Sequence, residues 1–206
     1  MNQQIRFLAI EPAVDHLQPV HCSLFTTDIA NHDDGYIALS YVWGSRADLF
    51  QVSVSQVYFW VTQNLDFALR NLRRRRPGCR FWVDAICINQ YPNAIVERGE
   101  QVKMMNVIYE FATQVIACLG PAPDSDAEEV VATDLRTVLE NANPQFSQEF
   151  FEECAQAVQP DLVESAKDAI ALLCRHQYWM RTWTLQEMAL ASDIVFIYGH
   201  KVIPWV

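Results

Sequence analysis

The sequence lacks the patterns that mark several large classes of protein. Only six of its 206 residues are glycine, and no Gly-rich phosphate loop is found. No apolar run approaches the roughly 20 residues that span a bilayer. The first twenty residues also lack the basic-then-apolar pattern of a secretory signal. We therefore expect neither P-loop chemistry nor membrane insertion nor secretion.

Patterns of metal ligands are missing as well. None of the six cysteines forms a C-x-x-C pair, and the five histidines show no spacing typical of a metal site or of a nucleophile's partner. Cys87 and Cys118 lie inside apolar runs, where a thiol behaves as a small buried hydrophobic group. We therefore predict no metal and no cofactor, reduced cysteines and a cytoplasmic protein.

Positive charge is scarce. The chain has 15 Lys and Arg against 25 Asp and Glu, which gives a net charge of -10. An acidic surface repels phosphate backbones, so nucleic acid is not an expected partner. The one basic run, Arg73 to Arg76, precedes Pro77-Gly78 and is typical of a helix C-terminus.

Apolar segments alternate with helical patterns along the chain. Its length fits a single domain, 1–206, and the end at Trp205-Val206 without a clear terminator is compatible with the first domain of a longer protein. Buried strands are predicted at 36–43, 80–88, 115–119 and 194–198, and helices at 62–77, 95–112 and 179–191. This order predicts an α/β fold with a doubly wound, mostly parallel sheet.

Two regions leave alternatives open. Residues 5–10 and 20–25 are short strand candidates that either join this sheet or pair antiparallel at its edge. The acidic stretch at about 122–172 is helix-prone and interrupted by Asn143-Pro144 and Gln159-Pro160. It is interpreted as a helical insertion, either a lid or ordinary helical packing.

Three segments carry a family resemblance. Residues 36–44, 81–90 and 179–187 are rich in Trp, and their order resembles the fungal heterokaryon incompatibility (HET) domain over nearly the whole chain. HET domains are associated with programmed cell death after the fusion of unlike fungal cells. The family is itself similar to TIR domains, which implies a TIR/flavodoxin-like fold. Thr184, where TIR domains often have Cys, and the 122–172 segment depart from the TIR pattern.

The resemblance implies a site at the carboxyl ends of the strands, where open α/β sheets bind ligands. In TIR domains that cleave NAD, a helix glutamate is catalytic, and the matching residue is Glu187. A carboxylate in a water-poor crevice stabilises the positive charge that develops on the ribose when the bond to nicotinamide breaks. The residues expected to bind substrate around it are Tyr41, Trp43, Gly44, Asp84, Arg181 and Trp183.

Structural interpretations of the same residues compete with these. Glu187 is as well explained by an ion pair with Arg181 or Arg98, and Asp84 by a turn cap. Trp43 and Trp183 are also typical core residues.

Two functions therefore follow from the resemblance. One is a death effector that cleaves NAD, with NAD as a substrate rather than a cofactor. The other is a non-catalytic module that assembles with itself or with other death-signalling proteins. Full turnover by Glu187→Gln would exclude the assignment of Glu187.

Overall fold

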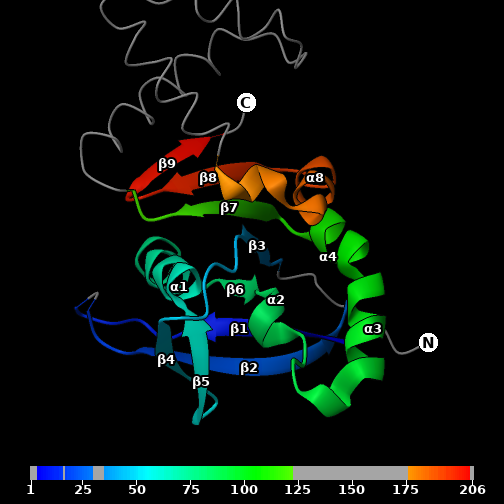
Figure 1. Ribbon diagram of the computed structural model, residues 1–206, viewed down its shortest axis with the longest axis horizontal. Helices are drawn as coiled ribbons and strands as arrows, with labels where there is room; N and C mark the ends of the chain where they lie inside the picture. The colour runs from blue at the N-terminus through cyan, green and yellow to red at the C-terminus, as the bar shows by residue number, and fades with distance from the viewer. Residues whose placement is uncertain (1–3, 16, 30–34, 123–175, 205–206) are drawn as a thin grey trace, which may run out of the picture.

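Nine strands form one sheet in the computed structural model, within the residues that it describes: 4–15, 17–29, 35–122 and 176–204. Their order across the sheet is β5-β4-β2-β1-β6-β3-β7-β8-β9 (Figure 1). The strands are β1 (Gln4–Ile10), β2 (Val20–Asp28), β3 (Ile37–Tyr41), β4 (Leu49–Val54), β5 (Val57–Thr62), β6 (Arg80–Trp82), β7 (Gln114–Gly120), β8 (Ile194–Tyr198) and β9 (Lys201–Pro204).

Five α-helices and two short 3-10 helices are described besides these strands. Figure 1 shows α3 and α4 along one side of the stacked strands. The helices are α1 (Gln63–Arg75), α2 (Asp84–Cys87), α3 (Ile95–Lys103), α4 (Met105–Phe111), α8 (Thr182–Ala189), η2 (Pro92–Ala94) and η3 (Gln177–Met180).

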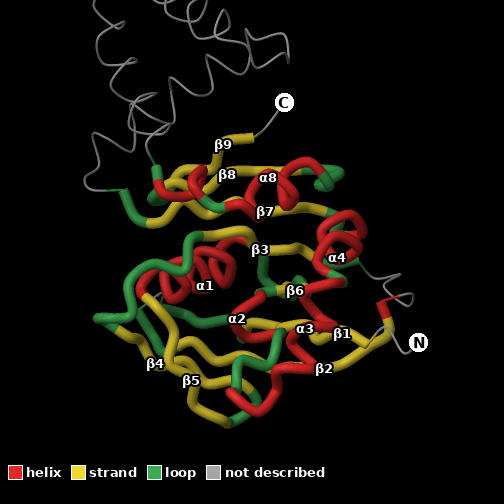
Figure 2. Tube along the Cα trace, turned by 45° about the vertical axis from the view of Figure 1, so that its right-hand side comes forward, coloured by secondary structure: helices red, strands yellow, loops and turns green. Residues whose placement is uncertain are grey.

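The predicted doubly wound, mostly parallel sheet is wrong, because the sheet is mixed. Parallel ladders join β6, β3, β7 and β8, and also β2 and β4. Antiparallel ladders join β1 to both β2 and β6, and β4–β5 and β8–β9 are hairpins. The hairpins lie at opposite ends of the sheet (Figure 2). The first strand is therefore internal, not an edge strand, and it runs antiparallel to both of its neighbours, β2 and β6.

The hairpin β4–β5 escaped the sequence prediction because its turn carries no glycine. Ser55 and Gln56 both have positive φ, 49° and 67°, which is the backbone of a tight hairpin turn. Asn-Gly is the usual sequence there, so Ser-Gln gives no turn signal.

Three predicted elements are shorter or interrupted in the structure. The strand predicted at 80–88 stops at Trp82, because Asp84 accepts a hydrogen bond from the Ala85 N–H (2.7 Å) and begins α2. The helix predicted at 95–112 is divided at Met104 into α3 and α4. The helix predicted at 179–191 is interrupted at Arg181, whose extended backbone (ψ 129°) separates η3 from α8.

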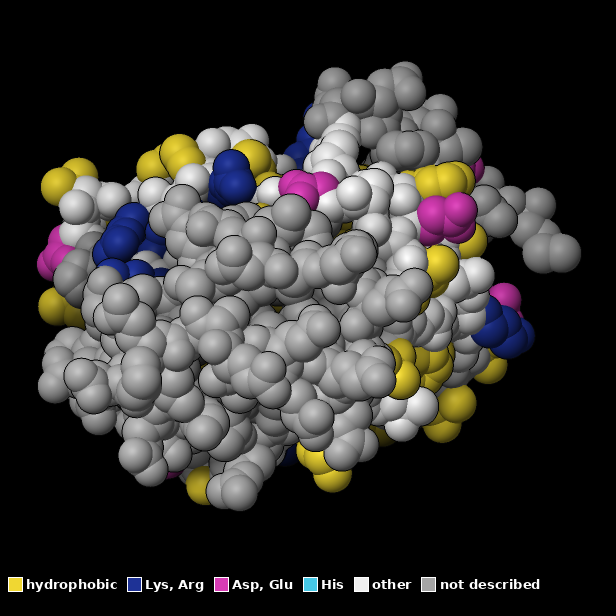
Figure 3. Space-filling model, turned by 90° about the horizontal axis from the view of Figure 1, so that it is seen from above, with side chains coloured by type: hydrophobic (Ala, Val, Ile, Leu, Met, Phe, Trp, Pro, Cys, Tyr) yellow, Lys and Arg dark blue, Asp and Glu magenta, His cyan; other side chains and the backbone are white. Residues whose placement is uncertain are grey.

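Residues 123–172 of the predicted helical insertion lie outside the described residues. Among the described helices, none is long and apolar enough to cross a bilayer. Where described residues are visible in the view from above, basic, acidic and hydrophobic side chains are interspersed (Figure 3).

The core explains why the central strands were predictable. All five residues of β3 are buried, and so are six of the seven in β7, since both strands are covered on both faces. Leu65, Leu69 and Leu72 of α1 are each at most 1% exposed and pack into the same hydrophobic cluster as Trp82. The ends of β3 and β6 are therefore fixed, and they position the candidate site.

Candidate functional site

The carboxyl ends of β3 and β6 bring two predicted site residues together. The strands are parallel neighbours, so Trp43, just after β3, lies beside Asp84, just after β6. The Trp43 Nε1–H donates a hydrogen bond to Asp84 Oδ2 at 2.7 Å. Trp43 is 39% exposed, so part of the side chain faces solvent while the hydrogen bond to Asp84 holds its indole nitrogen.

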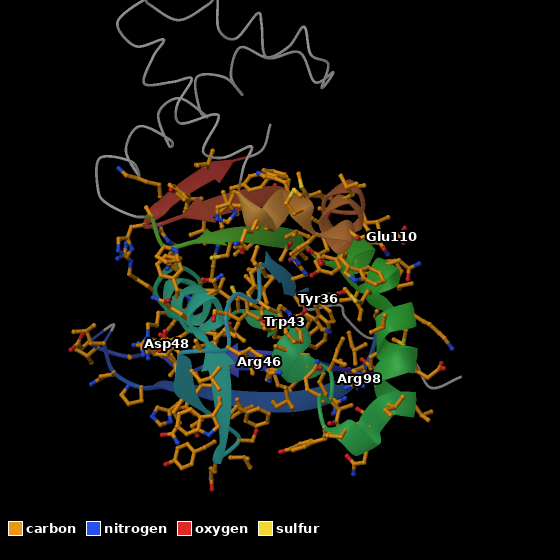
Figure 4. All side chains as sticks on the ribbon, viewed as in Figure 1. Tyr36, Trp43, Arg46, Asp48, Arg98 and Glu110 are labelled. Carbon is orange, nitrogen blue, oxygen red and sulfur yellow. The ribbon has the colours of Figure 1, made fainter. Side chains whose placement is uncertain are left out.

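A cleft of about 390 Å³ opens beside this pair, and we call it the tryptophan cleft. Four predicted residues, Trp43, Asp84, Arg181 and Trp183, line it. Figure 4 shows Trp43 and Arg98 near α2, with Arg98 on α3. The complete lining is Trp43, Asp84, Ile88, Gln90, Arg98, Val102, Met105, Arg181 and Trp183.

Glu187 lies beneath the cleft and is not among its lining residues. It is 1% exposed. Its Oε2 accepts a short hydrogen bond from the Ser40 hydroxyl, and Arg181 donates to both carboxylate oxygens at 3.4 and 3.5 Å. Ser40 Oγ also lies 2.7 Å from the Tyr178 hydroxyl. Glu187 therefore contacts the cleft through the guanidinium of Arg181, and the pair with Arg98 is not formed.

Both carboxyl groups have raised pKa values, and burial is the main cause for each. For Glu187, the charge of Arg181 and the Ser40 hydroxyl oppose the rise in pKa, and Asp84 adds to it. For Asp84, hydrogen bonds from Trp43 and the Ala85 N–H oppose the rise in pKa, together with the charge of Arg181. The charge of Arg181 thus opposes the rise in pKa of both acids, the partly exposed Asp84 and the buried Glu187.

Tyr41 and Gly44, the other two predicted site residues, do not line the cleft. Tyr41 is 2% exposed, and burial raises the pKa of its phenol, with a further rise from the charge of Asp84 and a hydrogen bond to that carboxylate. Gly44 has φ +76°, and a Cβ there would meet Asn64 Nδ2 at 2.8 Å. Asn64 donates to the Val42 carbonyl (3.0 Å), which fixes the turn after β3.

Sequence reasoning missed Ser40, Tyr178 and Arg98 as parts of the site. Ser40 is a polar residue inside an apolar strand, and Tyr178 directly precedes the third family segment, so both signals were present but weak. Arg98 was considered only as a partner of Glu187. It forms no hydrogen bond or ion pair with any residue that the structure describes, whereas its neighbour Glu97 pairs with Arg6.

Metal ligands do not gather in this part of the chain. Within residues 4–15, 17–29, 35–122 and 176–204, His, Cys, Asp and Glu form no group of three able to hold an ion. Four cysteines there are free thiols, and three of them are buried. The chemistry available in the cleft is therefore that of one carboxylate, two guanidinium groups and two indole rings.

Comparison with known proteins gives the family. The profile described as "Heterokaryon incompatibility protein (HET)" matches residues 36–187. The chain is 31% identical over 234 aligned positions to "Heterokaryon incompatibility protein 6, OR allele" of Neurospora crassa, covering 98% of this chain. The chain spans about a third (34%) of that relative's length. No solved structure matches the chain. The residues matched by the profile include both strand ends and Glu187, and the chain belongs to the heterokaryon incompatibility (HET) family.

Proposed function

We propose that this domain acts in heterokaryon incompatibility, in the cytoplasm, and triggers regulated cell death when non-self is recognised. The family and the name of the Neurospora relative support the first part. We further propose that the tryptophan cleft binds a nucleotide, NAD⁺, and cleaves it. The observation that carries this part is the gathering of two exposed indoles, two arginines and one carboxylate around a single cleft.

The cleft has the chemistry that a nucleotide requires. Trp43 and Trp183 are 39% and 44% exposed, so each offers ring surface on which a base or a nicotinamide can stack. Arg98 has no partner among the described residues and lines the cleft, and a guanidinium of this kind suits a phosphate. A volume of about 390 Å³ lies within the range of small-molecule sites.

Asp84 is the carboxylate that faces the ligand in this proposal. When the C–N bond between ribose and nicotinamide breaks, its electron pair leaves with nicotinamide and positive charge develops on the ribose. Asp84 stabilises that charge and accepts a proton from the water that attacks the ribose carbon. Its raised pKa suits it to take up that proton. The products are nicotinamide and ADP-ribose.

Glu187 contributes as a positioning residue. Its contacts to Arg181 and Ser40 hold the Arg181 side chain at the wall of the cleft. The TIR resemblance instead gives Glu187 the catalytic role, which requires Arg181 to move aside so that the carboxylate reaches the substrate. The two assignments differ in which substitution abolishes turnover.

Release of nicotinamide from NAD⁺ by the purified chain, followed by chromatography, tests this function. We expect release by the wild type, none by Asp84→Asn, and reduced release by Glu187→Gln with an altered KM. Asp48→Asn, an exposed carboxyl outside the cleft lining, is the matched control and keeps full activity. If Glu187→Gln abolishes the release of nicotinamide and Asp84→Asn does not, Glu187 is the catalytic residue. No release by any folded form, even when crowded, contradicts cleavage of NAD⁺.

One observation favours a second function, self-assembly without catalysis. The edge strand β5 exposes Val57, Tyr58 and Trp60 by 54%, 67% and 63%. Exposed apolar groups on an unpaired edge favour association with another strand. In that case sedimentation shows concentration-dependent oligomers that Val57→Glu dissolves. A chain that stays monomeric at every concentration contradicts this second function.

A further inference from the structure

A second, larger cavity adjoins the tryptophan cleft, and the function proposed above leaves it unused. It has a volume of about 580 Å³ and lies between the β4–β5 hairpin, the turn after β3 and the segment leading into α3. We call it the hairpin basin. The two cavities share a wall made by Trp43, Ile88, Gln90 and Arg98.

The basin is cationic in a strongly acidic chain. Its lining includes Arg6, Arg46 and Arg98 and contains no Asp or Glu, although the net charge of the chain is -10. Arg6 is already engaged, because it donates to the Cys87 carbonyl at 2.8 Å and pairs with Glu97. Arg46 and Arg98 form no ion pair with any described residue. Figure 4 shows both of them near α2. Two uncompensated guanidinium groups on one cavity indicate an anionic ligand.

Aromatic surface accompanies these charges. Tyr58, Trp60 and Tyr91 line the basin and are 67%, 63% and 62% exposed. Large rings left in solvent next to arginines are suited to stack on a base. The basin therefore repeats the chemistry of the tryptophan cleft, with arginine and tryptophan but without a carboxylate.

We propose that the hairpin basin binds the second half of a dinucleotide whose first half occupies the tryptophan cleft. This inference rests on the proposed function. The bridging diphosphate lies at the shared wall, where Arg98 contacts it from one side and Arg46 from the basin. The nicotinamide half lies beside Asp84, and the adenine stacks on Trp60. Since each cavity has a volume suited to one nucleotide, a dinucleotide fills both.

Calorimetric titrations of the whole chain with NAD⁺ and with nicotinamide mononucleotide test the inference. Every form titrated, including the reference called wild type, carries Asp84→Asn so that the ligand is bound but not cleaved. We expect Arg46→Ala and Trp60→Ala to weaken NAD⁺ binding by about tenfold each, the loss typical of one phosphate contact or one stacked base. The affinity for the mononucleotide stays within about twofold of the wild type in both variants, because that ligand carries only the nicotinamide-side phosphate, on the Arg98 side, and reaches neither Arg46 nor Trp60. Trp60→Phe, which keeps a stacking ring, restores most of the NAD⁺ affinity. Arg74→Ala, an exposed arginine of α1 outside both cavities, is the control.

The outcomes separate this inference from the proposed function. If the wild type binds both ligands and the Arg46 and Trp60 variants bind NAD⁺ as the wild type does, the inference is wrong and the cleft still binds a nucleotide. If these variants lose affinity for both ligands equally, the inference is also wrong, because the substitutions then disturb the tryptophan cleft itself. If the wild type binds neither ligand, the proposed function fails and this inference fails with it.

Discussion

Replacement of Ser40 by alanine tests how the buried carboxylate is held. Ser40 is 1% exposed, and its hydroxyl contacts both Glu187 Oε2 and the Tyr178 hydroxyl. A hydrogen bond to a charged group contributes about 1.5–3 kcal/mol, and a buried hydroxyl left without its partner adds to the loss. We therefore expect Ser40→Ala to lower the free energy of unfolding by about 3 kcal/mol at a pH where Glu187 is ionised.

The effect depends on pH through Glu187. Burial raises the pKa of this carboxyl above its ordinary value of 4.5, so the folded state holds the proton more tightly than the unfolded state. The contribution of this group to the free energy of unfolding therefore falls as the pH rises from 4.5 through the folded pKa. Ser40 stabilises the ionised form, and its loss costs most above that pKa. Below it, only about 1 kcal/mol of a neutral hydrogen bond remains to be lost.

Urea denaturation of the wild type and Ser40→Ala across this pH range measures the difference. Ser192→Ala is the matched control, because the Ser192 hydroxyl donates to a neutral acceptor, the Ala112 carbonyl, at 3.1 Å. Its cost, about 1 kcal/mol, is independent of pH. A cost of Ser40→Ala that is equally independent of pH, or that persists in full in the Glu187→Gln background, refutes the claim that Ser40 holds an ionised Glu187.

Three further predictions concern two backbone turns and the described thiols. Gly44→Ala lowers the free energy of unfolding by about 1–3 kcal/mol in urea, because φ is +76° and the new Cβ meets Asn64; an unchanged midpoint contradicts this. Gln56→Gly raises the thermal midpoint, because relief of a left-handed backbone of about 1–2 kcal/mol exceeds the entropy cost of glycine, about 0.5–1 kcal/mol; a lower midpoint contradicts it. Among the four described thiols, Cys79 reacts first with a thiol reagent, measured by peptide mass spectrometry, since burial raises the pKa of the other three to about 12. Faster labelling of Cys118 contradicts that order.

The elements that sequence predicted correctly are those with continuous burial. The strand at 36–43 and the strands at 115–119 and 194–198 are covered on both faces, so their apolar runs are visible without knowledge of partners. The helix after Thr62 shows its leucine stripe for the same reason. Strand direction could not be predicted in this way, because the antiparallel pairing of β1 with β6 joins segments about 70 residues apart and leaves no local pattern in the sequence.

The residues of the candidate site also differ in how far the sequence could predict them. Trp43 and Asp84 follow neighbouring strands, so their meeting could be predicted from the positions of the strand ends. The burial of Glu187 could not, because its partner Ser40 is 147 residues away. The family resemblance identifies the segment that carries a carboxylate, but only the packing of η3 and α8 decides which carboxylate faces the cleft.

Arg98 is the most direct test residue for the nucleotide-binding role, because it lines both cavities and has no partner among the described residues. The measurement is a calorimetric titration of the chain with NAD⁺, compared with Arg98→Ala and with Lys103→Ala, an exposed cation of the same helix paired with Glu100. Each form, including the reference called wild type, carries Asp84→Asn so that NAD⁺ is not cleaved. We predict saturable binding by the wild type and Lys103→Ala, and binding at least about tenfold weaker by Arg98→Ala. Absence of saturable binding by the wild type, or equal affinity of Arg98→Ala, would contradict a nucleotide site between Trp43 and Trp183.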